Sequence, residues 1–354
     1  MSRIINHIQA KHEAYVEEMR RDEKVIILGE DLEHVGCMNG VSRGLFEEFG
    51  KTRVIQTALA ENGPSYFAVG LAFAGYRPLM EFEFLEAAGW TFSSIIYEAA
   101  KQRYMTYGAL SCPIMFSLPQ GSGMGVGGNH ASVGEAIFCN APGLKVYAPL
   151  FPYDIKGLAK YAIREDDPVV FLDVKRQIEG EVPDEGIDYV VEPGKARVVS
   201  EGSDITIVGW QYGVMVAMEA EAELKNMGIS AEILDLRTLV PMDEEAICRS
   251  VQKTGKLLVV SESRARGGFG NEVVRVVAQN CFSSLQGSHP VEYIGCKDYP
   301  IPYGPGDKFV LPQKEDVIAA VQRMLYGHFL VVNLADGAVE VPTDGNCASY
   351  DYCE

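Results

Sequence analysis

Short apolar runs alternate with longer stretches of helical spacing along the first half of the chain. An apolar run of about four to eight residues, bounded by glycine or polar residues, is typical of a buried strand. Alternation of such strands with helices favours a parallel sheet covered by helices. The predicted strands are Val25–Leu28, Arg53–Ile55, Leu79–Phe84, Ile114–Leu118, Leu144–Ala148 and Val169–Leu172.

Two of the intervening helical patterns can be described in more detail. A helix rich in small residues is predicted from Ser65 to Gly75. Between Ala88 and Tyr104, apolar residues recur at helical spacing, so one face of that helix should pack into the core. The residues of that face are Phe92, Ile95, Ile96, Ala99 and Ala100.

A polar segment separates this half from a second alternation of strands and helices. Glycines, prolines and acids interrupt Lys175 to Pro193, which is typical of an interdomain linker. After it, strands are predicted at Ile205–Val208, Ala231–Leu234 and Lys256–Val260, with helices ending at Met227, starting at Asp243 and following Gly270. We therefore expect an α/β chain with domains at 1–175 and 196–328, a linker at 176–195 and a tail at 329–354 without clear periodicity.

Composition and charge narrow the class of protein. The 354 residues are 47% hydrophobic and 23% charged, an ordinary globular composition. The net charge of −18 disfavours nucleic acid and anionic membranes as partners, and it suits a basic protein. No apolar run approaches the ~20 residues that span a bilayer, and no signal peptide is evident. Eight cysteines without metal-ligand spacing indicate reduced thiols, so we expect a soluble protein of the cytoplasm, or of the mitochondrial matrix if a transit peptide has been removed.

The most distinctive stretch contains five glycines between Gly121 and Gly128, followed by His130. Glycine is concentrated where the backbone takes positive φ or approaches a ligand closely. The stretch follows a predicted strand, and ligands of parallel α/β sheets gather at the carboxyl ends of strands. It matches neither the dinucleotide nor the Walker signature. The residues alone leave two readings open: a site with a titratable imidazole, or a surface loop with a structural histidine.

Acidic residues stand at two further junctions. Glu30 and Asp31 follow the first predicted strand, and Glu61 precedes the helix that begins near Ser65. A carboxylate at a helix start commonly caps the helix, because the free amides and the macrodipole favour negative charge there. Glu61 is therefore either a cap or a catalytic group on this evidence.

Ordered short motifs from about residue 5 to 325 match one family. The chain resembles the β subunit of the thiamine diphosphate-dependent 2-oxo acid dehydrogenases, which belongs to a transketolase-like family. The motifs include Leu28-Gly-Glu-Asp31, Ala60-Glu61, Gly75-Tyr-Arg-Pro78, His130, Pro142-Gly-Leu-Lys-Val146, Gly194-Lys-Ala-Arg-Val198, Asp235-Leu-Arg-Thr-Leu239 and Gly267-Gly-Phe-Gly270.

The resemblance implies a fold, an activity and a set of site residues. It implies a pyrimidine-type thiamine diphosphate-binding domain followed by a smaller transketolase C-terminal-like domain. The implied reaction is oxidative decarboxylation of a 2-oxo acid, with pyruvate favoured, and acyl transfer to a lipoyl group. Glu61 would bond the aminopyrimidine ring nitrogen, and His130 would supply a proton during reductive acylation, which suits an imidazole of ordinary pKa ~6.5. Phe84 would pack on the pyrimidine, with Glu30 and Asp31 also at the cofactor.

The resemblance also implies partners and ions. No Gly-Asp-Gly…Asn element for magnesium occurs in a strand-helix context, so an α subunit should hold the magnesium and the diphosphate half of the site in an α₂β₂ tetramer. The second domain would dock the basic domain of a dihydrolipoyl acyltransferase. The backbone carbonyls of Ala162, Glu165 and Asp167 match a loop that holds potassium in several relatives.

Some positions depart from the family pattern and keep alternatives open. The family usually has His-Ser-Gln after the glycine loop, whereas this chain has His130-Ala131-Ser132. The family's aromatic and Asp-Gln positions are Ala87, Ser93 and Ser94 here. The alternatives are a catalytically silent structural or regulatory relative, an acetoin dehydrogenase-type subunit, and a free-standing half of a transketolase or of deoxyxylulose phosphate synthase.

Overall fold

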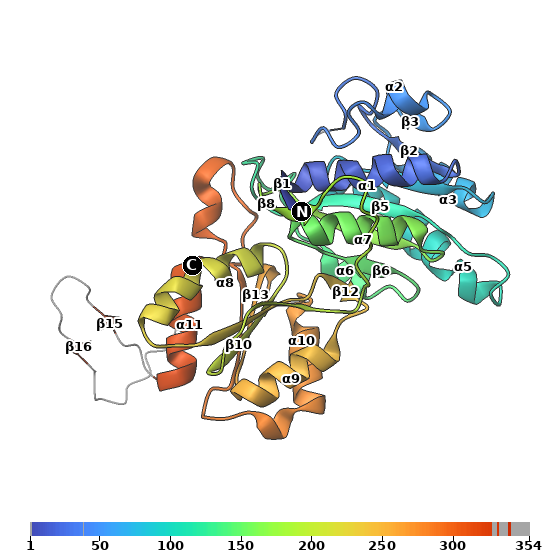
Figure 1. Cartoon of the computed structure of the whole chain (residues 1–354). Coiled ribbons are helices and arrows are strands. Elements are labelled where there is room, and N and C mark those ends of the chain that lie inside the picture. Colours follow the sequence, from blue (N-terminus) through green and yellow to red (C-terminus); the bar gives the residue numbers. More distant parts are fainter. Residues whose placement is uncertain (1, 38, 328–330, 333–338, 341–354) are drawn as a thin grey trace.

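The chain folds into two α/β domains that lie side by side, as the blue-to-green and yellow-to-red halves of Figure 1 show. The computed structural model describes residues 2–37, 39–327, 331–332 and 339–340. The predicted fold class, a parallel-sheet domain followed by a second α/β domain, is confirmed.

The first domain is built on a seven-stranded sheet with the order β12-β6-β7-β5-β4-β2-β3. Its strands are parallel except β12, which runs antiparallel to β6. All six strands predicted in the first half are present, and β12 is an addition from the second half of the sequence. The bounds are β2 (Val25–Gly29), β3 (Val54–Gln56), β4 (Arg77–Glu81), β5 (Met115–Gln120), β6 (Lys145–Tyr147), β7 (Val169–Val174) and β12 (Thr238–Val240).

Helices cover this sheet, so its central strands are buried along their length, as expected for a parallel sheet. The small-residue helix predicted from Ser65 to Gly75 is α3. The bounds are α1 (His7–Arg21), α2 (Leu45–Phe49), α3 (Asn62–Phe73), α4 (Ala88–Phe92), α5 (Ala100–Met105), α6 (Glu135–Cys139) and α7 (Pro152–Arg164), with short turns η1 (Leu85–Ala87) and η2 (Ser93–Ala99).

The helix predicted between Ala88 and Tyr104 is divided by a π-helical stretch, η2. Ile95, Ile96 and Ala99 face the core as predicted, but Phe92 is 39% exposed, so its assignment to the core was wrong. The wider i→i+5 turns of a π-helix break the 3.6-residue period. Phe92 lies just before η2 and is therefore rotated out of the inward face.

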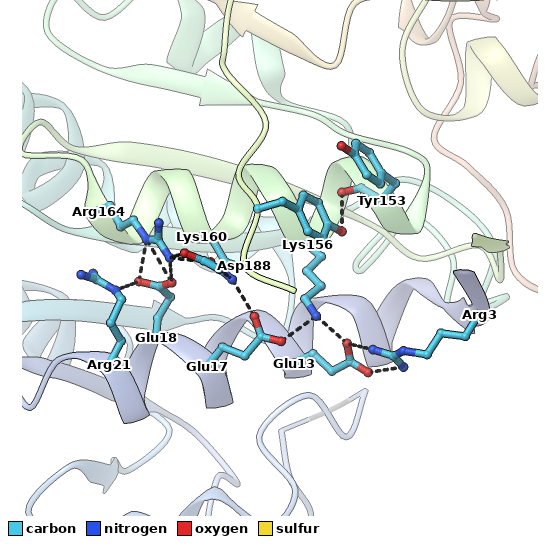
Figure 2. A network of polar contacts seen from close by, with 11 residues as sticks. Arg3, Glu13, Glu17, Glu18, Arg21, Tyr153, Lys156, Lys160, Arg164 and Asp188 are labelled. Carbon is cyan, nitrogen blue, oxygen red and sulfur yellow. Dashed lines mark hydrogen bonds and ion pairs between the residues drawn. The ribbon is translucent and has the colours of Figure 1, made fainter. Parts of the chain in front are cut away.

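A ladder of charges ties α1 to α7, as Figure 2 shows. Lys156 and Lys160 are almost fully buried, and each pairs with glutamates of α1: Lys156 Nζ lies 2.8 Å from Glu13 and 2.6 Å from Glu17. Lys160 Nζ lies 2.6 Å from Glu17 and also contacts Asp188, whose pKa is lowered to about 2 by its cationic partners. These pairs compensate the cost of burying two ammonium groups.

The second domain carries a five-stranded sheet with the order β14-β13-β10-β11-β9, in which β9 is antiparallel to β11. Its predicted strands and helices are all present. The bounds are β9 (Arg197–Ser200), β10 (Ile205–Gly209), β11 (Ala231–Asp235), β13 (Leu257–Arg264), β14 (Val291–Cys296), α8 (Tyr212–Asn226), α9 (Glu244–Thr254), α10 (Gly270–Asn280), η3 (Phe282–Ser284), η4 (Gly304–Phe309) and α11 (Lys314–Tyr326).

The segment predicted as a linker, 176–195, contains strand β8 (Glu179–Pro183), which pairs antiparallel with β1 (Ser2–Asn6). Of the tail predicted at 329–354, only the paired strands β15 (Val331–Val332) and β16 (Val339–Glu340) lie within the described residues. Among the helices that the structure describes, none combines the length and apolarity needed to cross a membrane.

Candidate active site

The two acids that follow β2 have different surroundings. Because Gly29 pairs with Glu81, the carboxyl ends of β2 and β4 meet at one edge of the sheet. Glu30 is buried there, and its Oε1 has no hydrogen-bond partner among the described residues. Asp31 is exposed and has a φ of 51°, a left-handed conformation that aspartate tolerates. A buried carboxyl oxygen without a partner marks Glu30 as a group that can receive a ligand.

Glu61 directly precedes α3, yet its side chain makes no capping hydrogen bond to the helix. The residue is helical itself, with φ −46° and ψ −30°, and its backbone carbonyl accepts from the Ser65 amide at 3.0 Å. Its carboxyl group is half-buried. The capping alternative for Glu61 is therefore not the observed one, and the carboxyl group remains available for chemistry.

Glu30, Glu61 and Glu83 form a cluster of interacting carboxyl groups. The pKa of Glu30 is raised to about 7, mainly by burial and additionally by the negative charges of Glu61 and Glu83. The pKa of Glu83 is also raised, first by burial and then by Asp31 and Glu61, whereas His130 lowers it. A carboxyl group whose pKa is raised by burial and by neighbouring acids is typical of acid–base sites.

His130 and Phe84 complete this cluster. Their rings stack with centroids 3.9 Å apart and an interplanar angle of 22°. Lys175 lies over the Phe84 ring at 5.1 Å and also donates a hydrogen bond to the His130 carbonyl oxygen. Burial lowers the pKa of Lys175 to about 8, although Glu86 and Glu262 oppose the shift. The exposed imidazole of His130 thus lies near the half-buried Glu83, whose pKa it lowers.

Comparison with known proteins places this arrangement in a family. The pyrimidine-binding domain of transketolase matches residues 4–179, and the transketolase C-terminal domain matches residues 194–317. The 2-oxoisovalerate dehydrogenase subunit beta of Bacillus subtilis (strain 168) is 40% identical over 326 residues, which cover 91% of this chain and 98% of that protein. The pyruvate dehydrogenase E1 component subunit beta of Rickettsia bellii (strain RML369-C) is 40% identical over 322 residues, covering 90% and 98%.

The chain belongs to the β subunits of the thiamine diphosphate-dependent 2-oxo acid dehydrogenases. It is therefore the β subunit of an E1 component, an acyl-transferring oxidoreductase. A solved structure, a split gene transketolase described as an inactive beta4 tetramer, shares its fold with a TM-score of 0.74 and 26% identity, covering 91% of this chain and 98% of that one.

The structure brings most of the site residues predicted for this β subunit together. Glu30, Glu61, Phe84 and His130 share one cluster, and the charge of Asp31 reaches it from the exposed edge. Phe84 carries the His130 ring on one face, a contact that the resemblance did not imply.

Of the three residues predicted for potassium, Ala162 lies in the last turn of α7, and Glu165 and Asp167 follow the helix. The Ala162 carbonyl accepts from the Glu165 amide at 3.3 Å, and the Glu165 carbonyl accepts from Arg77 Nη1 at 2.9 Å. The Asp167 carboxylate pairs with Arg103. The guanidinium of Arg77 thus already donates to one of the three carbonyl oxygens. Such a loop is better described as part of an ion-pair network than as a set of free oxygen ligands for a cation. Potassium stays a prediction and enters no step of the proposal.

Two residues of the cluster were missed in the sequence. Glu83 follows β4 and Lys175 follows β7, so both stand at carboxyl ends of strands, where polar residues commonly bind ligands. That signal was present for both. What the sequence could not show is the order of the strands, which places β4 beside β2 and β7 beside β5.

The glycine loop, residues 121–130, takes the backbone conformation that its composition predicts. Gly121, Gly123, Gly125 and Gly127 all have positive φ, between 69° and 118°. The close approach is made by residues outside the first domain: a Cβ on Gly127 would lie 2.6 Å from the Tyr303 ring. The loop therefore bends against the second domain while it carries His130 to the site.

Proposed function

We propose that this β subunit, together with an α subunit, decarboxylates a 2-oxo acid and reductively acylates a lipoyl group, whose disulfide accepts the two electrons and the acyl group. The observation that carries the proposal is the cluster of Glu61, Glu30 and Glu83 beside the stacked Phe84 and His130 rings. Pyruvate and 2-oxoisovalerate are the substrates to test, because relatives named for each are 40% identical to this chain.

The residues present fit an aminopyrimidine ring. Glu61 offers a carboxyl group that can share a proton with a ring nitrogen, and Glu30 offers a buried oxygen with no partner among the described residues. Phe84 supplies an aromatic face beside them. Thiamine diphosphate, when bound, supplies the carbon nucleophile that attacks the keto carbon and takes up the electrons released with CO₂. Glu61 would hold the proton at the pyrimidine nitrogen, and Glu30, with a pKa near 7, would keep the cluster partly protonated.

His130 would act in the second half-reaction. Acyl transfer to a lipoyl disulfide opens the S–S bond and leaves one sulfur as a thiolate that needs a proton. The exposed imidazole of His130 would donate this proton, and the stack on Phe84 would fix the ring orientation. Asp31 lies at the exposed edge of the site.

An α subunit would complete the site with the diphosphate half and magnesium. The sequence offers no Gly-Asp-Gly…Asn element for that purpose, and large apolar side chains of the first domain are exposed, which supports a missing partner. They include Leu59, Tyr66, Phe67, Trp90, Phe92, Tyr97, Tyr104 and Tyr107. The net charge of −18 suits docking of a basic acyltransferase domain on the assembled enzyme.

Two assays on the reconstituted enzyme separate the roles of Glu61 and His130. Decarboxylation is followed with ferricyanide as electron acceptor, which needs no lipoyl group, and acyl transfer is followed with a lipoyl domain. Glu61→Gln should reduce both rates by roughly a hundredfold or more, because general acid–base groups contribute about that much. His130→Ala should reduce only the lipoyl-dependent rate.

Matched variants guard against general damage. Glu47→Gln removes an exposed acid from the first turn of α2, and His289→Ala removes an exposed histidine of the second domain, so both should leave the two rates unchanged. Unchanged turnover in Glu61→Gln would rule out its catalytic role and favour the silent relative. Loss of both rates in His130→Ala would contradict a role limited to acyl transfer.

A further inference from the structure

The second domain makes several hydrogen bonds and close contacts with the glycine loop that carries His130. Glu262, half-buried on β13, accepts two hydrogen bonds at one oxygen, from the Ser122 amide at 2.7 Å and the Ser122 hydroxyl at 2.5 Å. A Cβ on Gly121 would lie 2.1 Å from the other Glu262 oxygen. Gly121 therefore has no side chain at the point where the Glu262 carboxylate contacts the loop backbone, and a larger residue would clash there.

Further contacts hold the rest of the loop. Val126 forms an isolated antiparallel bridge with Tyr303, and the Gly304 amide donates to the Gly125 carbonyl at 3.0 Å. The Tyr303 ring fills the space where Gly127 would carry a side chain. Both ends of this part of the loop are therefore set by the second domain, although His130 itself belongs to the first.

Two neighbouring cations, Arg176 and Lys175, extend these contacts from Ser122 to His130. Arg176 donates to the Ser122 hydroxyl and to Asp307, both at 2.8 Å. Its neighbour Lys175 donates to the His130 carbonyl and lies over the Phe84 ring on which His130 stacks. Glu262, Ser122 and Arg176 thus form one hydrogen-bonded group that fixes the start of the loop, and Lys175 fixes its end.

We propose that Glu262 is a positioning residue of the second domain, which holds the glycine loop so that His130 faces the site. The proposal rests on the acyl-transfer role of His130. A loop with four glycines at positive φ has many competing conformations once its contacts are removed, because glycine loses more backbone freedom on ordering than any other residue. Two hydrogen bonds to a carboxylate are strong enough to select one of them.

Replacement of Glu262 should therefore affect the two half-reactions differently. Glu262→Ala leaves both Ser122 donors without their acceptor, and the lipoyl-dependent kcat should fall about tenfold or more, since a displacement of about 1 Å can cost a hundredfold. The ferricyanide rate and the KM for the lipoyl domain should stay within about twofold. Glu262→Gln, which keeps an oxygen acceptor for Ser122, should recover most of the loss.

A control variant, a double variant and a measurement without activity test whether the effect of Glu262→Ala is specific to the loop. Arg197→Ala removes another contact between the domains, the ion pair with Asp154 at 3.1 Å, and should not change the ratio of the two rates. Addition of Glu262→Ala to His130→Ala should cause no further loss, because the glutamate acts through the histidine. Amide hydrogen exchange in the isolated chain provides a readout without activity: peptides covering 121–132 should exchange faster in Glu262→Ala, with the rest of the chain unchanged.

The outcomes separate this proposal from the function on which it rests. If His130→Ala loses the lipoyl-dependent rate while Glu262→Ala keeps both rates, the positioning role is overturned and the function stands. If His130→Ala keeps both rates, the function of His130 fails first. An equal loss of both rates in Glu262→Ala, or a loss of the same size in Arg197→Ala, would reduce Glu262 to a purely structural residue and overturn the proposal.

Discussion

At the scale of single residues, a raised pKa has two different meanings in this chain. Glu30 has a pKa of about 7 beside other acids, in a cluster that borders exposed residues. Asp235 also has a pKa of about 7, but it is fully buried in β11, where burial is the main cause and the charge of Asp154 adds to it. Its Oδ1 accepts from the Arg237 amide, and its Oδ2 has no partner among the described residues. Only the setting separates a site acid from an interior one.

Asp235 should make stability depend on pH. Its folded pKa, about 7, lies above the unfolded value of about 3.9, so the folded chain binds the extra proton. Its contribution to stability is therefore complete below about pH 4 and is lost as pH rises through about 7. Asp235→Asn, which stays neutral, should melt several degrees higher than the wild type at pH 8 and about equally at pH 4.5. Asp204→Asn, at a half-buried acid before β10, serves as control. Thermal unfolding curves that keep the same pH dependence in Asp235→Asn would contradict this assignment.

At the scale of elements, α3 combines poor helix formers with an exposed apolar face. Tyr66 and Phe67 are 40% and 53% exposed, and a Cβ on Gly63 or Gly70 would meet nothing within 4 Å. A helix whose glycines have no close neighbour among the described residues has space for another chain to approach closely. Glu61 directly precedes this helix.

Gly70→Ala should therefore have opposite effects on the isolated chain and on assembly. Alanine is favoured over glycine in a helix interior by about 1 kcal/mol, so the isolated chain should become more stable. If the α subunit packs against α3, the added methyl group should weaken α–β association, measured by analytical ultracentrifugation of mixtures. Gln252→Ala, on the exposed side of α9, should leave association unchanged. Equal association in both variants would place the α subunit elsewhere.

At the scale of the whole molecule, the two domains share a sheet and several ion pairs in addition to the segment that connects them. β12, from the second half of the sequence, extends the sheet of the first domain, and Asp154 of α7 pairs with Arg197 and Arg237. The grip of Glu262 and Tyr303 on the glycine loop belongs to the same interface. The site of the first domain is thus supported by the second.

The assembled enzyme is the whole-molecule test. Native mass spectrometry of the protein from its source, with thiamine diphosphate and magnesium, should show an α₂β₂ tetramer with two bound cofactors. We expect this because the chain carries the cluster of Glu30, Glu61 and Glu83, proposed to bind the pyrimidine, and exposes large apolar side chains. A homodimer that binds no cofactor, even with candidate α subunits present, would support the structural or regulatory relative instead.

The sequence by itself determined the succession of the main strands and helices along the chain, since apolar period and glycine punctuation are local properties. The strands β1, β8, β9, β12 and β14 were not predicted. The sequence also located Glu61, His130 and the positive-φ glycines, through motifs that need no coordinates. Only the tertiary structure decided that Glu83 and Lys175 join the cluster, that Phe92 turns outward, and that the glycine loop bends against Glu262 and Tyr303. Those outcomes depend on the order of strands within the sheet, on a π-helical phase shift and on contacts between residues 140 or more positions apart, none of which leaves a periodic trace in the sequence.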